Sequence, residues 1–206
     1  MKEKRRVLIL SVISLSVFLI ALMFIIFGKV SIDYFISKLA RKMWNSSGEG
    51  FFIFIGDYSR RIIVFIAITV AVFLYSQKRR MQSLVLVLTL VAGFILEHIL
   101  ELIIQRGRPA IQMIQESGYS FPSGHSISSI ILFSFIIYFY KDEIKNKAGR
   151  AIFIFINIFL ILLAGFSRIY LNVHWFTDAI GGYALGFFLF NMSVLFLKDK
   201  KFFQQN

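Results

Sequence analysis

Residues 7–27 read VLILSVISLSVFLIALMFIIF, an apolar run that contains three serines and no charged residue. A transmembrane helix needs about 20 predominantly apolar residues, so this run predicts a membrane-spanning helix. Four basic residues precede it, as they would precede the core of a signal peptide. The run is too long for such a core and lacks a small-x-small cleavage site, so we expect a retained membrane anchor.

The composition of the whole chain agrees with a membrane protein. Of its 206 residues, 58% are hydrophobic and 25 are Phe, whereas ordinary soluble domains are about 45–50% apolar. The same composition excludes a disordered chain. The chain has no Cys, which excludes disulfides, thiolate nucleophiles and Cys-ligated metals. The basic residues, 23 Lys and Arg against 11 Asp and Glu, lie mostly between apolar runs, so we expect an anionic bilayer as partner rather than nucleic acid.

Five further apolar runs favour five more spans, which we place at residues 62–76, 82–105, 125–140, 151–166 and 177–197. In the last run, Gly182 and Gly186 predict close helix packing.

Between the first two spans, residues 30–44 mix apolar and basic side chains and predict an amphipathic helix at the outer interface; a poorly packed loop is the alternative. Residues 45–48 (Asn-Ser-Ser-Gly) should end it. The predicted fold class is all-α: a multi-pass integral membrane protein with six transmembrane helices and an interfacial helix between the first two, forming one domain over residues 1–206.

The charge distribution predicts the orientation. If the N-terminus is cytoplasmic, every segment on that side is short and basic, and together these segments hold 14 of the 23 Lys and Arg. The positive-inside rule therefore favours cytoplasmic N- and C-termini in a cell membrane.

Three polar strings lie at the ends of predicted spans. They are residues 106–109 (Arg-Gly-Arg-Pro), residues 119–125 (Tyr-Ser-Phe-Pro-Ser-Gly-His) and residues 167–178 (Ser-Arg-Ile-Tyr-Leu-Asn-Val-His-Trp-Phe-Thr-Asp). They contain both prolines and two of the three histidines of the chain. With a cytoplasmic N-terminus, all three strings fall at the extracytoplasmic face, where we expect them to form one site.

The residue types in these strings suit phosphate chemistry. Asp178 follows His174 by four residues, so a helix starting there puts both on one face. A carboxylate on one imidazole nitrogen fixes the tautomer and leaves the other nitrogen nucleophilic. Arg108 and Arg168 suit a bidentate grip on phosphate oxygens.

Residues 123–125 add an anion site and an acid. A helix that begins here presents free N–H groups to an anion, and Gly124 allows close backbone approach. His125 then supplies a proton for a leaving oxygen. The combination predicts phosphoryl transfer through a phospho-histidine, with no metal and no cofactor. Each string also has a structural reading taken alone: an i,i+4 salt bridge, a helix end before proline, or a serine N-cap.

Together the strings resemble the signature of the type 2 phosphatidic acid phosphatase superfamily, Lys-x6-Arg-Pro, Pro-Ser-Gly-His and Ser-Arg-x5-His-x3-Asp. The second and third motifs match fully, and the first matches at Arg108 and Pro109. The resemblance covers residues 101–178, and the six-helix plan extends it to the whole chain. It implies His174 as nucleophile, Asp178 as its orienting partner and His125 as acid. It also implies phosphate binding by Arg108, Ser123, Gly124 and Arg168. Soluble vanadium haloperoxidases share the signature, but six spans argue against one.

One position departs from the family pattern. The lysine of the first motif would fall at residue 101, where this chain has Glu101. Position 101 lies two helical turns before Arg108, so Glu97, Glu101 and Arg108 share one face of the third span. Either Glu101 pairs structurally with Arg106 or Arg108, or it contacts a hydroxyl-rich head group or tunes these arginines.

The predicted function is that of a metal-independent membrane lipid phosphatase acting on a phosphomonoester or diphosphate lipid at the extracytoplasmic face. Phosphatidylglycerophosphate is the favoured substrate, and undecaprenyl diphosphate is the alternative. A lipid phosphotransferase with an alcohol acceptor and a non-catalytic transporter or scaffold are further alternatives. The sequence leaves the oligomeric state open.

Overall fold

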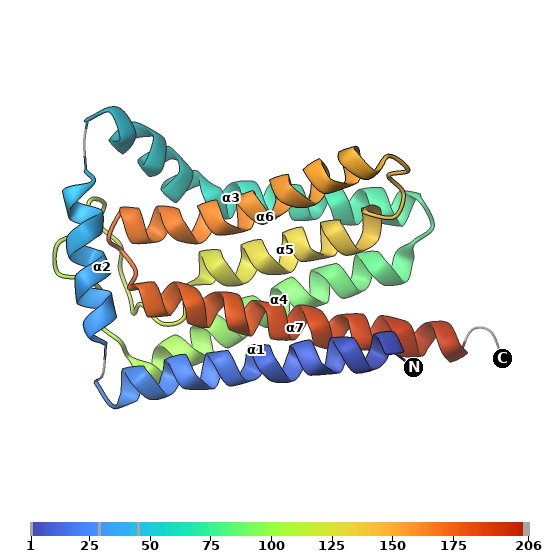
Figure 1. Ribbon diagram of the computed structural model, residues 1–206, viewed down its shortest axis with the longest axis horizontal. Coiled ribbons are helices and arrows are strands. Elements are labelled where there is room, and N and C mark those ends of the chain that lie inside the picture. The colour runs from blue at the N-terminus through green and yellow to red at the C-terminus, as the bar shows by residue number, and fades with distance from the viewer. Residues whose placement is uncertain (1, 29, 45, 204–206) are drawn as a thin grey trace.

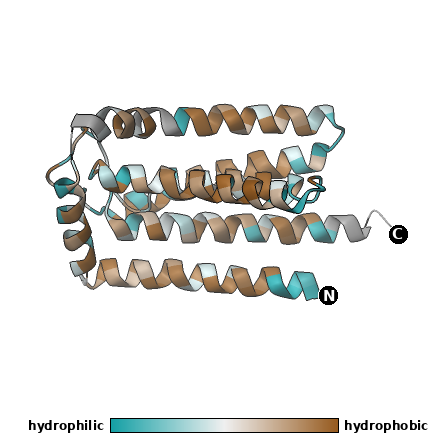
Figure 2. Cartoon of the chain, turned by 45° about the horizontal axis from the view of Figure 1, so that its top comes forward, coloured by the Kyte–Doolittle hydropathy of each residue, from teal (hydrophilic) through white to brown (hydrophobic). Residues whose placement is uncertain are grey.

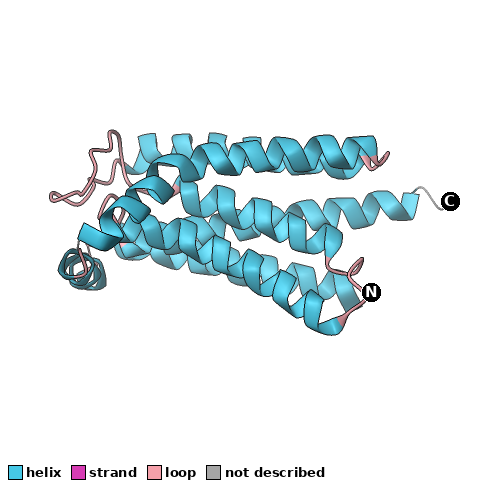
Figure 3. Cartoon of the chain, turned by 90° about the horizontal axis from the view of Figure 1, so that it is seen from above, coloured by secondary structure: helices cyan, strands magenta, loops and turns pink. Residues whose placement is uncertain are grey.

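A computed structural model describes residues 2–28, 30–44 and 46–203 of the chain. Within these ranges all regular secondary structure is helical, as Figure 3 shows, and this confirms the all-α prediction. The helices are α1 (Lys2–Ile26), α2 (Ser31–Lys42), α3 (Ser46–Ser76), α4 (Arg80–Ile104), α5 (Gly124–Tyr140), α6 (Lys147–Tyr170) and α7 (Phe176–Phe203).

Several of these helices have the length and composition of membrane spans. Among the described residues, α1, α4, α6 and α7 are long and apolar enough to cross a bilayer, and the bent helix α3 raises the number to five. Helix α5 is apolar but has only 17 residues. Figure 2 shows apolar residues along the flanks of the bundle and polar residues toward its ends.

Helices α1, α3, α4, α5, α6 and α7 run side by side, and α2 lies across one end of the bundle (Figure 1). Helix α1 begins and α7 ends at the opposite end, where Lys198 Nζ lies 2.7 Å from Glu3 Oε2. The α4–α5 segment and the α6–α7 turn lie at the α2 end. All three polar strings of the sequence are therefore at this end.

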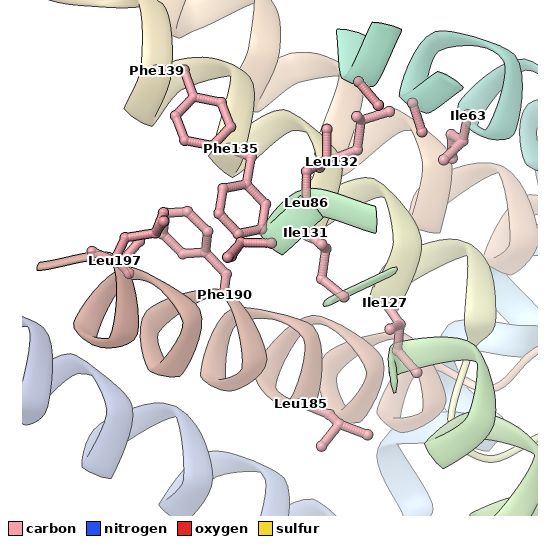
Figure 4. Close-up of a cluster of buried hydrophobic side chains, with 14 of the residues drawn as sticks. Ile63, Leu86, Ile127, Ile131, Leu132, Phe135, Phe139, Leu185, Phe190 and Leu197 are labelled. Carbon is pink, nitrogen blue, oxygen red and sulfur yellow. The ribbon is translucent and has the colours of Figure 1, made fainter. Parts of the chain in front are cut away.

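Helix α5 forms the centre of the bundle and contacts α3, α4, α6 and α7. Its side chains Ile131, Leu132 and Phe135 are fully buried, and Figure 4 shows them packed among residues of the neighbouring helices. Because α5 is surrounded by other helices, it is apolar all round, which is the pattern of a buried helix.

The close packing predicted from Gly182 and Gly186 is present between α7 and α5. A Cβ atom on Gly182 would lie 2.6 Å from the carbonyl oxygen of Ser123, and one on Gly186 would lie 2.8 Å from that of Ile127. Both glycines therefore let the backbone of α7 approach the beginning of α5.

The start of α3 differs from the prediction. The sequence predicts a helix break at residues 45–48 and a span from residue 62, whereas α3 already begins at Ser46 and bends by 50° between Gly50–Gly56 and Arg60–Ser76. Residue 45 lies outside the described residues, and residues 46–48 are helical, in agreement with the preference of serine for helix starts as well as loops. The added turns bring the partly buried Phe52 against Tyr170, with 3.9 Å between the centroids of the two stacked rings.

We predict that Gly186→Ala destabilises the protein by about 1–3 kcal/mol, the usual cost of overpacking. The new methyl group would lie 2.5 Å from Ile130 Cγ2 and would push α7 away from α5. Gly50→Ala is the matched control, because no atom lies within 4 Å of a Cβ there. Thermal unfolding in detergent should show a lower midpoint for Gly186→Ala only; equal midpoints for the two variants would contradict this packing argument.

Candidate active site

The three polar strings contact one another through their backbones at the α2 end of the bundle. The hydrogen bonds run from Ser120 N to Arg106 O (2.9 Å), from Met113 N to Leu171 O (2.9 Å) and from Ser123 N to Asp178 O (3.1 Å). Residues from the end of α4, the start of α5 and the α6–α7 turn therefore form one site.

His174 lies at the centre of this site with 5% of its surface exposed. Its Nδ1 atom is 2.8 Å from the carbonyl oxygen of Ser120, and its Nε2 atom is 3.1 Å from Nη1 of Arg108. A carbonyl only accepts and a guanidinium only donates, so these partners assign the proton to Nδ1 and the lone pair to Nε2. This geometry fits a neutral imidazole with its lone pair on Nε2, the form that a nucleophile would need.

Asp178 is fully buried and lies close to His174 without a direct hydrogen bond to its ring. Its Oδ2 atom is 3.7 Å from His174 Nδ1, beyond hydrogen-bond distance, and accepts instead from the backbone N–H of Trp175 at 2.8 Å. Its Oδ1 atom accepts from Arg106. The sequence predicts a direct carboxylate–imidazole bond, but the Ser120 carbonyl makes that bond and Asp178 acts on the ring through its charge.

These surroundings shift the pKa of His174. Burial lowers this pKa below its usual value of about 6.5, Asp178 opposes the shift, and the positive charges of Arg108 and Arg168 add to it. The imidazole is therefore neutral at physiological pH, as a nucleophile requires.

Arg106 joins the site to α2. Its Nη2 atom is 2.5 Å from Oδ2 of Asp33, and its Nη1 atom bonds to Asp178 and, at 2.7 Å, to Thr177 Oγ1. Asp33 has no exposed surface and also accepts from the backbone N–H and the hydroxyl of Thr177, at 2.8 and 2.6 Å. The guanidinium lies over the Trp175 ring, 5.6 Å from its centroid. Asp33, Arg106, Thr177 and Asp178 thus form a buried network, which we call the Arg106 network.

Sequence reasoning missed Asp33. The available indication was that it is the one acidic residue in the basic and apolar stretch of residues 30–44. The buried face of α2 contains Asp33 and Ala40, while Tyr34, Phe35 and Leu39 are exposed. The helix therefore directs its carboxylate into the protein.

The anion site predicted at the start of α5 involves Ser123 and Gly124. Ser123 occupies the N-cap position, and its buried hydroxyl has no hydrogen-bond partner in the part of the chain that the structure describes. A Cβ atom on Gly124 would lie 2.0–2.4 Å from the carboxylate of Glu97, so a larger residue would have to displace that carboxylate. Arg108 also donates to the carbonyl oxygen of Val173 at 2.8 Å, which holds its guanidinium beside His174.

Arg168 is almost fully buried at the end of α6. Its Nη1 atom donates to the carbonyl oxygen of Gly56 on α3 at 2.9 Å, and its Nη2 atom forms an ion pair with Glu116. Its own carbonyl oxygen accepts from the backbone N–H of Val173 at 3.1 Å. Arg168 is thus fixed next to the turn that carries His174, and Glu116 holds the guanidinium of a predicted phosphate ligand.

His125 faces a cavity of about 780 Å³ that Gly56, Arg60, Arg61 and Glu116 also line. A second, mostly apolar groove of about 280 Å³ lies between α3, α4 and α5 and reaches Gly124. Arg60 lines both spaces.

Glu101 does not take either of the partners predicted for a structural role. Among the described residues, neither Arg106 nor Arg108 forms an ion pair with it, because Arg106 pairs with Asp33 and Asp178. Glu101 is half-buried near the end of α4.

The chain belongs to the PAP2 superfamily, whose family model matches residues 82–202. This confirms the resemblance drawn from the three motifs and makes the chain a member of a lipid phosphatase superfamily.

Two curated relatives and one solved structure are similar over most of the chain. Phosphatidylglycerophosphatase B of Bacillus subtilis is 30% identical over 85% of this chain and 88% of its own. Undecaprenyl-diphosphatase of Sulfolobus acidocaldarius is 25% identical over 71% of this chain and 69% of its own. The crystal structure of a transmembrane PAP2-type phosphatidylglycerolphosphate phosphatase from Bacillus subtilis superposes with a TM-score of 0.76 at 27% identity, covering 90% of this chain and 96% of that one.

We predict that Asp33→Asn lowers the phosphatase rate by about 10- to 100-fold, because breaking a buried ion pair typically costs about 3–5 kcal/mol and disturbs its neighbours. The variant removes one of the two carboxylates that hold Arg106. Phosphate release by the purified protein measures the effect. Asp142→Asn is the control, since Asp142 is exposed and lies 3.8 Å from its partner Arg150. A wild-type rate for Asp33→Asn would rule out a role of α2 in the site.

The pH dependence should follow His174. Protonation of Nε2 removes the nucleophile, and burial lowers the pKa of His174, so the acid limb of the kcat/KM profile should lie below about pH 6.5. Asp178→Asn removes the charge that raises this pKa, so its residual activity should decline at a lower pH than that of the wild type. Rate profiles between pH 4 and 8 test both statements, and an acid limb centred above pH 6.5 would contradict them.

Proposed function

We propose that the chain is a metal-independent membrane lipid phosphatase, with phosphatidylglycerophosphate as its favoured substrate, that works through a phospho-histidine on His174. The observation that carries this proposal is the neutral ring of His174 with Nε2 next to the guanidinium of Arg108. A nucleophile and a phosphate-binding cation are thereby at the same point. The similarity to phosphatidylglycerophosphatase B supports the choice of lipid.

In the first step, Nε2 of His174 attacks phosphorus and forms an N–P bond while the bond from phosphorus to the lipid oxygen breaks. His125 gives a proton to that oxygen as it leaves. The imidazole becomes positively charged, and Asp178 stabilises it. The charge on the phosphoryl oxygens is balanced by donors already in place, namely Arg108, Arg168, the Ser123 hydroxyl and the N–H groups around Gly124.

In the second step, water attacks phosphorus and the N–P bond breaks. His125, now neutral, takes a proton from the water, and inorganic phosphate leaves. His174 returns to its neutral form with its proton on Nδ1. Arginines and helix N–H groups neutralise the developing charge in both steps, so no metal ion is required.

We place this site at the extracytoplasmic face of the cell membrane, with both termini in the cytoplasm and the whole chain acting as one domain. Helices α1, α3, α4, α5, α6 and α7 are the six proposed spans, and α2 lies in the outer interface. The basic segments on the opposite side support this orientation. The exposed Tyr34, Phe35 and Leu39 on α2 support interfacial binding.

A second candidate substrate is undecaprenyl diphosphate, since the relative from Sulfolobus acidocaldarius is an undecaprenyl-diphosphatase. The apolar groove between α3, α4 and α5 fits either lipid, because a tail entering sideways from the bilayer would pass along it to Gly124.

Replacing the nucleophile tests the function. His174→Ala should lower phosphate release by at least about 1,000-fold in detergent containing EDTA. The assay compares phosphatidylglycerophosphate, undecaprenyl diphosphate and phosphatidic acid. His98→Ala is the matched control, because His98 is exposed on α4 and its Nδ1 atom bonds to the carbonyl oxygen of Phe94 in the same helix. Residual activity of His174→Ala within tenfold of the wild type would refute the assignment.

A further inference from the structure

We propose that Arg60 and Arg61 of α3 form a second anion site, which binds the second phosphorus group of a lipid that carries two. In such a lipid a phosphodiester, or the lipid-linked phosphate of a diphosphate, lies a few bonds from the scissile phosphate. This inference rests on the proposed phosphatase function and specifies the substrate class for the same site.

The position of the cavity supports the proposal. Arg60 and Arg61 line the cavity of about 780 Å³ that His125 also faces. In the proposed mechanism, His125 protonates the leaving oxygen, so the lipid side of the scissile bond lies beside it. The two arginines line the same cavity and are therefore placed for the rest of the head group, and not for the transferred phosphoryl group.

The guanidinium of Arg60 is held in place from two directions. Its Nη2 atom is 2.7 Å from Oε2 of the buried Glu97, and its Cζ atom is 5.3 Å from the centre of the Phe94 ring. A guanidinium carries five N–H donors in a rigid fork, and the bond to Glu97 uses one of them. An arginine fixed in this way is suited to bind an anion with its other donors.

The order of the spaces matches the order of groups in a two-phosphorus lipid. Arg60 lines both the apolar groove and the cavity, and Val64 and Ile68 are shared in the same way. From bilayer to nucleophile, the protein presents an apolar groove, then Arg60, then His125 and then His174. The lipid presents a tail, a phosphate, a leaving oxygen and the terminal phosphorus. Phosphatidic acid has no anion at the second of these places.

The ion pairs around the cavity also agree with an anion site. Among the described side chains, Glu97 and Glu116 near the cavity are each paired with an arginine, Glu97 with Arg60 and Glu116 with Arg168. Helix α4 has Glu101 where the family pattern has lysine, and the structure places cations on α3 instead.

The test measures substrate preference in Arg61→Gln and in the double variant Arg60→Gln/Glu97→Gln, which avoids leaving Glu97 buried without its partner. The value of kcat/KM is determined for phosphatidylglycerophosphate, undecaprenyl diphosphate and phosphatidic acid in the same detergent. We expect the preference for the two-phosphorus lipids over phosphatidic acid to fall at least tenfold, mainly through KM. Arg61→Lys should retain part of the wild-type preference. Arg80→Gln, at the other end of the bundle, should keep the wild-type preference.

An unchanged preference in both variants would overturn the second anion site, even if all rates fall together, because a merely structural role lowers every rate alike. The variant that misfolds is recognised by its thermal unfolding and by loss of phosphatidic acid hydrolysis. A wild-type protein that releases phosphate from none of the lipids would instead refute the proposed function. A larger loss on phosphatidylglycerophosphate indicates a site for the diester phosphate, and a larger loss on undecaprenyl diphosphate indicates one for the inner phosphate of a diphosphate.

Discussion

Arg106 lies between two fully buried carboxylates, Asp33 on α2 and Asp178 at the start of α7. Moving one ion from water into a protein interior costs several kcal/mol unless partners and hydrogen bonds compensate it. Three such groups are stable here only as a complete set, together with the N–H and hydroxyl of Thr177. The network thereby connects the helix across the end of the bundle, the end of α4 and the turn that carries His174. Without it, the carboxylate of Asp178 would keep one described hydrogen-bond donor, the N–H of Trp175.

The bundle contributes rigidity to this end through close backbone contacts. Gly182 and Gly186 bring α7 against α5, and Gly124 brings the beginning of α5 against Glu97. Of the groups proposed to act on phosphate, Arg108 and His174 lie on connections between helices, and the others lie at or next to the helix ends. The helices beneath fix where those connections begin and end. This arrangement is the usual one for catalytic groups, which need precise positions on a rigid scaffold.

Much of this could be predicted from the sequence because the decisive features are local. Apolar runs of a given length predict membrane helices, and the motif spacings bring His174, Asp178 and the arginines to span ends. The parts that escaped prediction depend on contacts distant in sequence. Asp33 is hydrogen-bonded to Thr177, which is 144 residues away in the sequence. The one indication of its role was its negative charge within a basic stretch. The hydrogen bond to His174 comes from a backbone carbonyl, which has no residue signature. The predicted pairing of Glu101 with Arg106 is wrong for the same reason. Neighbours in sequence can be paired from their spacing, whereas the spacing does not indicate a carboxylate on another helix.

Arg108, which helps to keep His174 neutral, also blocks the Nε2 atom of its ring. Arg108 Nη1 lies 3.1 Å from Nε2, where its positive charge helps to keep the ring neutral and its N–H occupies the lone pair. In the proposed mechanism the lone pair must become free before it attacks phosphorus. A phosphate oxygen carries negative charge and is a stronger acceptor than a neutral imidazole, so an arriving phosphate draws the N–H of Arg108 to itself and uncovers Nε2. Binding of the phosphate then also activates the nucleophile. In a site that holds only water, Nε2 of His174 stays hydrogen-bonded to Arg108.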